Sequence, residues 1–123
     1  MRHILLILFF ACLPLTRSQA QVQISHIETT SAWYYVYDQS GRKVKAFSRQ
    51  IGVLVGYSSS FFVVRTSSWY YCYDAEGKKL ATLYVKNTGE VVGVAGDTFT
   101  ARKGAFIYTY DKHGKIVATR SAN

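Results

Sequence analysis

Beyond residue 20, apolar and polar residues alternate in short runs that recur along the chain. A segment with the pattern aromatic-x-Tyr-x-Tyr-Asp-x-x-Gly-basic occupies residues 33–42, 69–78 and 106–115. The aspartates of the three copies lie 36 and 37 residues apart. A fixed period of this size is typical of proteins built from structural repeats.

The sequence around the three copies repeats as well. Apolar segments follow the first and second copies at residues 51–56 and 90–96, and others precede the second and third copies at 61–65 and 98–102. Each segment has the character of a short strand, and turn residues mark the joints between segments. We therefore expect an all-β fold: an antiparallel meander of about eleven strands in three four-strand repeats of 36–37 residues, with the third repeat lacking its last strand.

Such a meander can form a β-propeller-like array or a small closed barrel, and a β-trefoil-like fold is the alternative. Open sheet edges invite aggregation, which favours a closed sheet. We therefore expect a monomer, closed by pairing of the N-terminal segment near residues 22–27 with the last strand. The alternative is a dimer in which two chains complete each other.

The three Asp-x-x-Gly segments predict hairpin turns. An aspartate at the first turn position accepts hydrogen bonds from nearby backbone N–H groups, and a glycine can adopt the left-handed conformation that ends the turn. We expect positive φ angles at Gly41, Gly77 and Gly114. The alternative is a cation site, but each turn offers one carboxylate, with Glu76 adding a second in the middle turn, and calcium requires six or more oxygens.

Aromatic residues occupy one face of each repeated strand, because alternate side chains in a strand point the same way. The residues on this face are Trp33, Tyr35, Tyr37, Trp69, Tyr71, Tyr73, Phe106, Tyr108 and Tyr110. The scarcity of large aliphatic residues favours this face as the core. The alternative is a partly exposed stacking surface for sugars or bases, which would use Trp33, Tyr35, Trp69, Tyr71, Phe106 and Tyr108.

The repeated Tyr-x-Tyr-Asp-x-x-Gly-[Arg/Lys] motif at 35–42, 71–78 and 108–115 resembles the signature of YD (Rhs-type) repeats. The whole four-strand unit is similar to a β-propeller blade, including the quinoprotein type. These resemblances imply a β-sheet scaffold. Quinoprotein-type blades carry a docking Trp after the turn glycine, which residues 42–46, 78–82 and 115–119 lack, so we expect no cofactor.

Residues 1–20 have the layout of a secretory signal peptide, which leaves residues 21–123 as a single all-β repeat domain. A basic start precedes the apolar run Ile4–Leu13, and Ser18-Gln19-Ala20 resembles a cleavage site. We expect a secreted or periplasmic protein with no transmembrane segment in the mature chain. The alternatives are an uncleaved anchor and a lipid on Cys12.

Composition places the chain among single-domain globular proteins. Of the 123 residues, 49% are hydrophobic and 18% charged, which excludes a disordered chain. Cys72 is the only cysteine after the signal peptide, so no internal disulfide is expected. We expect Cys72 to be a small buried apolar residue, with an intermolecular disulfide as the alternative.

Positive charge is the main clue to a partner. The formal net charge is +8, and basic residues cluster just past the turns at Arg42, Lys43, Lys78, Lys79, Lys112 and Lys115. If the repeats pack side by side, these residues form an anion-binding rim, or else an ordinary solvated rim. Arg65 and Arg102 occupy equivalent positions, where they would close a turn or stack on Trp69 and Phe106.

Residue patterns for catalysis are absent from the sequence. His26 and Glu28 share a face, but two ligands do not make a metal site. We therefore expect no enzyme, metal or cofactor, but an exported binding module that recognises an anionic polymer, a glycan or another envelope protein, and not nucleic acid. The alternatives are a structural or assembly protein of the cell envelope and, more remotely, a hydrolase.

Overall fold

A computed structural model describes residues 22–122 of the chain. The expected signal peptide and Cys12 lie outside the described residues. The elements, in chain order, are β1 (Ile24–Thr29), β2 (Trp33–Asp38), β3 (Lys43–Ser48), the 3-10 turn η2 (Arg49–Ile51), β4 (Val53–Tyr57), β5 (Phe61–Arg65), β6 (Trp69–Asp74), β7 (Lys79–Tyr84), the single helical turn α2 (Val85–Thr88), β8 (Glu90–Ala95), β9 (Thr98–Lys103), β10 (Phe106–Asp111) and β11 (Ile116–Ser121).

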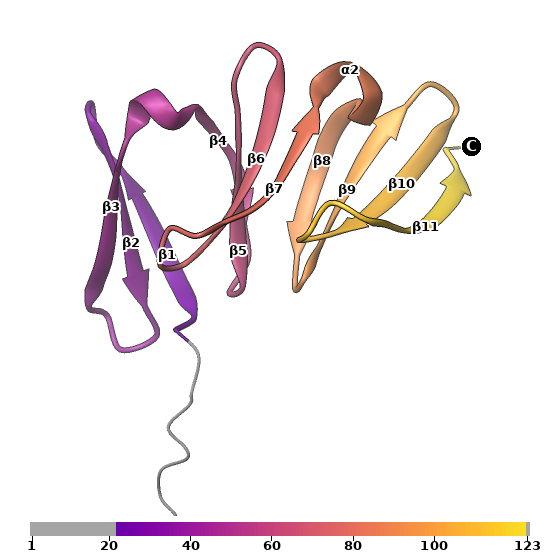
Figure 1. The fold of residues 1–123 in the computed structure, drawn as a ribbon. Helices are drawn as coiled ribbons and strands as arrows, with labels where there is room; N and C mark the ends of the chain where they lie inside the picture. The colour runs from indigo at the N-terminus through magenta and orange to yellow at the C-terminus, as the bar shows by residue number, and fades with distance from the viewer. Residues whose placement is uncertain (1–21, 123) are drawn as a thin grey trace, which may run out of the picture.

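The strands form three antiparallel sheets that follow one another along the chain (Figure 1). Sheet A has the order β1-β2-β3, sheet B the order β4-β5-β6-β7, and sheet C the order β8-β9-β10-β11. The expected all-β class and the eleven antiparallel strands are confirmed. No helix among residues 22–122 has the length and apolar character needed to cross a membrane.

The division into repeats differs from the expected one. The three-stranded sheet is the first, not the last, because each full sheet begins at the strand that follows a linker glycine, Gly52 or Gly89. At Gly52 the φ angle is 138°, and a Cβ would lie 2.8 Å from the carbonyl oxygen of Arg65, so only glycine lets the chain enter the next sheet here.

The expected pairing of the first and last strands is not observed. Strand β1 pairs with β2 in sheet A, whereas β11 pairs with β10 in sheet C, at opposite ends of the stack (Figure 1). The strands of residues 22–122 therefore form no closed barrel. The physical reason is that each hairpin joins strands within its own sheet, and the linkers move the chain on to a new sheet without a hydrogen-bonded ladder between the two.

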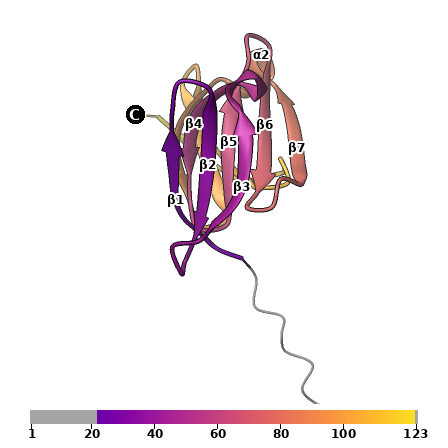
Figure 2. The ribbon, with the colours of Figure 1, turned by 90° about the vertical axis from the view of Figure 1, so that its left-hand side faces the viewer.

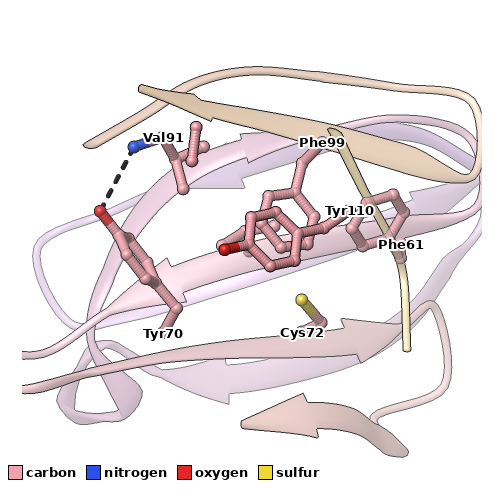
Figure 3. Close-up of a cluster of buried hydrophobic side chains, with 8 residues drawn as sticks. Phe61, Tyr70, Cys72, Val91, Phe99 and Tyr110 are labelled. Carbon is pink, nitrogen blue, oxygen red and sulfur yellow. Dashed lines mark hydrogen bonds between the residues drawn. The ribbon is translucent and has the colours of Figure 1, made fainter. Parts of the chain in front are cut away.

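Two separate apolar cores lie between the sheets, and sheet B contributes to both. Tyr34 and Val36 of sheet A pack with Phe62 and Val64 of sheet B in the first core. The second core joins sheets B and C (Figure 3), and its buried members are Phe61, Val63, Tyr70, Cys72, Val91, Phe99, Ala101 and Tyr110. Adjacent residues of β5 enter opposite cores, so this strand has no solvent-facing side.

The aromatic face, which was expected to be the core, is not the most deeply buried face of β2 and β6. Tyr34, Val36, Tyr70 and Cys72 are at most 2% exposed, whereas Trp33 and its equivalents on the aromatic face are largely exposed. The reason is that the face of β2 and β6 opposite the aromatic face packs onto the following sheet. The expectation that Cys72 is a small buried apolar residue is confirmed.

The Asp-x-x-Gly hairpins have the expected geometry. The φ angles of Gly41, Gly77 and Gly114 are 85°, 95° and 87°. At the first turn, the Asp38 carboxylate accepts hydrogen bonds of 2.9 Å from the backbone N–H groups of Ser40 and Arg42. The other two turns repeat this pattern, which stabilises each turn by satisfying its backbone donors.

Candidate functional site

The stack of sheets has two ends with different connections. One end, which we call the hairpin end, contains the turns at residues 38–43, 57–61, 74–79, 95–98 and 111–116. The opposite end, which we call the linker end, contains the connections at residues 29–33, 48–53, 65–69, 84–90 and 103–106. In Figure 1 the hairpin end lies at the bottom and the linker end, with α2, at the top.

All six cations of the expected anion-binding rim lie at the hairpin end, but several are already engaged. Lys43 lies with its Nζ 4.0 Å from the centre of the Tyr35 ring, and Lys79 lies 4.5 Å from that of Tyr71. Such cation–π contacts hold the ammonium groups against the sheets. The side chains of Arg42, Lys78 and Lys115 have no ion pair with a carboxylate of the described residues.

Lys112 has a structural role at the hairpin end. Its Nζ donates a hydrogen bond of 2.9 Å to the Ser60 hydroxyl in the turn of sheet B, and it lies 3.5 Å from the Asp97 carboxylate. Its backbone N–H also donates to the Asp97 carbonyl. Lys112 thus joins the turns of sheets B and C, and its charge is already paired.

The turn carboxylates add negative charge to the same end. Hydrogen bonds from the Ser40 hydroxyl and from backbone N–H groups lower the pKa of Asp38. The backbone N–H of Lys115 likewise lowers the pKa of Asp111, and the Ser60 hydroxyl together with the Lys112 charge lowers that of Asp97. These carboxylates are therefore ionised at neutral pH and offset part of the positive charge of the rim.

The linker end has the larger excess of positive charge. At the hairpin end, seven basic residues (Arg42, Lys43, Lys45, Lys78, Lys79, Lys112, Lys115) stand against five acidic ones (Asp38, Asp74, Glu76, Asp97, Asp111). At the linker end, six basic residues (Arg49, Arg65, Lys86, Arg102, Lys103, Arg120) stand against two acidic ones (Glu28, Glu90). The excess is two at the hairpin end and four at the linker end.

Exposed aromatic rings occur at one equivalent position of each sheet at the linker end. Trp33, Trp69 and Phe106 begin β2, β6 and β10 and are 43%, 40% and 48% exposed. The remaining residues of the expected aromatic face are less accessible. Tyr71 and Tyr108 are half-buried against the two cores, and Tyr35, also half-buried, lies on the outer face of sheet A.

Short threonine turns hold the two tryptophans in place. The Thr30 hydroxyl accepts a hydrogen bond of 3.0 Å from the Trp33 N–H, and the Thr66 hydroxyl accepts one of 3.1 Å from the Trp69 N–H. The sequences Thr-Ser-Ala-Trp and Thr-Ser-Ser-Trp at 30–33 and 66–69 were the signal for these turns. An alignment of the repeats that began upstream of the two tryptophans would have revealed these turns.

The arginines near these aromatics also differ from expectation. The guanidinium of Arg65 lies 5.5 Å from the ring centre of Tyr70 rather than over Trp69, and it pairs with Glu90 at 3.6 Å. Arg49, which the sequence interpretation did not select, donates a hydrogen bond of 2.9 Å to the Thr30 carbonyl. It occupies the linker immediately after sheet A.

The outer face of sheet A combines aromatic residues with His26 and Glu28. The His26 ring stacks on Tyr37 at 5.8 Å, and the Tyr37 hydroxyl donates a hydrogen bond of 3.0 Å to Glu28. This bond raises the pKa of Tyr37. His26 and Glu28 therefore both contact the aromatic residue Tyr37. Residues 22–122 contain no group of three or more His, Cys, Asp or Glu residues placed to hold a metal ion.

Comparison of the chain with protein-family models, with curated proteins and with solved structures finds no match.

Proposed function

We propose that the protein is an exported, non-catalytic binding module for an anionic polysaccharide, with its principal binding surface at the linker end. The observation that carries the proposal is the recurrence of an exposed aromatic ring at the same position of three successive sheets, at the end with the greater excess of positive charge. Trp33, Trp69 and Phe106 define this surface, which we call the aromatic row.

The spacing of the aromatic row suits a polymer. Packed sheets lie about 10 Å apart, so equivalent residues of successive sheets repeat at about that distance. Sugar rings stack on exposed aromatic side chains, and a chain of repeating units can contact several such rings at once. Each contact is weak, but linked contacts raise the overall affinity.

The basic residues of the linker end supply the preference for an anionic chain. Lys86 and Lys103 are exposed in the connections that flank the aromatic row, and neither pairs with a carboxylate among residues 22–122. An excess of positive charge attracts anions and speeds their association. The cations of the hairpin end, Arg42, Lys78 and Lys115, are a secondary site in this proposal.

The proposal also includes how the three sheets are arranged relative to one another. We propose that the three sheets are consecutive propeller-like blades, because each is a meander and the linkers lie at one end of the stack. Such an array places its equivalent residues in register, which is what the aromatic row requires.

Chromatography on immobilised heparin, an anionic polysaccharide, tests the proposal. We expect retention that falls as salt rises past physiological strength, since screening weakens attraction between exposed charges. Replacing Trp69 and Phe106 by Ala should reduce retention strongly, whereas replacing Lys78 and Lys79 by Ala should reduce it less. Retention that does not respond to salt, or that ignores the aromatic substitutions, would contradict the proposal.

A further inference from the structure

The linker end has an open hollow beside Trp33. Its volume is about 440 Å³, and its lining residues are Ser31, Ala32, Trp33, Ser48, Arg49 and Gln50. Its lining residues therefore include one aromatic residue, one arginine and three residues with hydroxyl or amide side chains. This is the composition of a site for a polar ring-shaped ligand that also carries negative charge.

Arg49 is positioned to face an anion. Its Nη1 donates to the Thr30 carbonyl at 2.9 Å, and its guanidinium lies 5.5 Å from the centre of the Tyr34 ring. No carboxylate of residues 22–122 forms an ion pair with it, although its side chain is exposed. An arginine that is held by a carbonyl and an aromatic ring, and that has no ion-pair partner among residues 22–122, is preorganised for a carboxylate. A guanidinium can bind a carboxylate through two parallel hydrogen bonds.

The hollow exists because one side chain is small. Ser48 lies opposite Trp33 in the ladder of sheet A, whereas Tyr84 lies opposite Trp69 in sheet B. The Tyr84 ring fills the equivalent space, with its centre 5.2 Å from that of Trp69. In sheet C a serine, Ser121, likewise lies opposite the aromatic residue Phe106. Sheet A differs from both other sheets in combining a tryptophan opposite a small side chain with an arginine at the next position.

An arginine at the position of Arg49 is likewise found in only one of the three sheets. The backbone N–H of Arg49 donates to the Ala32 carbonyl, and in sheet B the equivalent bond runs from Val85 to Ser68. The third equivalent bond runs from Ala122 to Ala105. The corresponding positions of sheets B and C thus carry Val and Ala, so the charged subsite occurs once among the three sheets.

We infer that the hollow is a subsite for a sugar residue bearing a carboxylate, a uronic-acid type of unit, whose ring stacks on Trp33 while its carboxylate binds Arg49. This inference rests on the proposed binding of an anionic polysaccharide and names the chemistry of one unit of it. Ser31, Ser48 and Gln50 lie around the hollow to bond the sugar hydroxyls.

Tryptophan fluorescence can test the subsite alone. The chain has two tryptophans, so a Trp69→Phe protein keeps Trp33 as its only tryptophan. This protein is titrated with trigalacturonate and, as the matched control, with trigalacturonate methyl-esterified at its carboxylates. We expect a saturable change in Trp33 emission, with the free acid binding about tenfold more tightly than the ester, as a charge-assisted pair predicts.

Two substitutions in the same background separate the parts of the subsite. Arg49→Gln should bring the affinities for acid and ester together. Ser48→Tyr copies the residue of sheet B and should weaken both ligands about tenfold or more by filling the hollow. The Ser48 hydroxyl accepts a hydrogen bond of 3.1 Å from the backbone N–H of Gln50, which Ser48→Tyr removes, so the unfolding midpoint is measured beside the affinity. Ser48→Gln, which also fills space, is the second variant, and unchanged affinity in a folded variant of either kind overturns the subsite.

The outcomes distinguish this inference from the proposed function. Equal affinity for acid and ester, or no change in Trp33 emission, overturns the subsite. Heparin retention that depends on Trp69 and Phe106 but is unchanged by Arg49→Gln and Ser48→Tyr also overturns the subsite, while the proposed function stands. Loss of acid preference in Arg49→Gln together with normal folding supports the subsite.

Discussion

The Tyr70 hydroxyl donates a hydrogen bond of 2.7 Å to the carbonyl oxygen of Gly89, the glycine that leads from sheet B into sheet C. The same hydroxyl accepts a bond of 3.3 Å from the backbone N–H of Val91 (Figure 3). One sheet earlier, Tyr34 makes the equivalent bonds to Gly52 at 2.8 Å and Leu54 at 3.0 Å. These tyrosines therefore fix where each following sheet begins.

Removing one of these hydroxyls should destabilise the fold. In Tyr70→Phe, the Val91 N–H and the Gly89 carbonyl lose their partner at a buried site, which costs about 1–3 kcal/mol. Urea denaturation should show a lower midpoint with an unchanged slope. Tyr57→Phe is the control, because Tyr57 is 37% exposed, and it should have a midpoint close to wild type. Equal midpoints for the two variants would contradict the role given to Tyr70.

The turn glycines offer a comparison between strain and crowding. Gly77→Val should lower the free energy of unfolding by about 1–3 kcal/mol, since a β-branched residue is strained at a φ of 95°. A Cβ at Gly77 would also lie 3.3 Å from the Phe47 ring, whereas one at Gly41 would meet nothing within 4 Å. Gly41→Val should therefore destabilise less than Gly77→Val. An unchanged midpoint for Gly77→Val would refute the turn assignment.

The turn carboxylates should make the protein sensitive to acid. The folded pKa values of Asp38 and Asp111 lie below the ordinary value of 3.8, so these two carboxylates stabilise the fold at pH above that value. This stabilisation is lost as pH falls from about 4 through the lower folded pKa. In Asp111→Asn, the unfolding midpoint should fall less steeply with acid than in wild type. A parallel pH profile for the two proteins would count against these turns as acid-sensitive groups.

The Cys72 thiol should be unreactive in the folded protein. Burial raises its pKa to about 12, so almost none is thiolate at pH 8. In a Cys12→Ser protein, a disulfide reagent should modify Cys72 only after denaturant is added. Rapid modification without denaturant would mean that the space between sheets B and C opens frequently.

The two outermost sheet faces predict a monomer. In sheet B, Phe61 and Val63 of β5 lie on the face that packs against sheet C. At the equivalent ladder positions of sheet C, Thr98 and Thr100 of β9 lie on its outer face. Figure 2 looks onto the outer face of sheet A. On this face His26 and Glu28 of β1 occupy the ladder positions that are apolar in the equivalent strand β5. Polar residues in place of apolar ones on an outer face are typical of terminal repeats. Sedimentation should give one monomeric species, and a stable dimer would indicate that the free edge of β1 pairs with another chain.

The sequence predicted local features well because their causes are local. The alternation of aromatic and polar residues determines the strands, and Asp38 with Gly41 determines its own turn without help from distant residues. The period of the repeat then predicted eleven strands. Each of these depends on residues within one repeat.

Features that depend on packing between repeats were not predicted. The sequence interpretation ended the first two repeats with the strands that are β4 and β8, but these strands begin sheets B and C. The reason is that Gly52 and Gly89 fit closely against the backbone of the sheet that each of them leads into. The exposure of Trp33 and the open space beside Ser48 likewise depend on which sheet packs on which. Arg49 escaped notice because its partner carbonyl, on Thr30, is 19 residues away.

The middle sheet, covered on both sides, determines how this architecture could be made longer. Ile107 occupies the position of Tyr34 and Tyr70 but has no hydroxyl to hold the start of another sheet, and its face carries threonines. A copy appended after β11 would therefore meet a surface without the tyrosine anchor or the apolar residues that it needs. Inserting a second copy of residues 53–89, which includes the linker glycine, would instead present two matching apolar faces. The middle repeat is therefore the building block from which an extended array could be engineered.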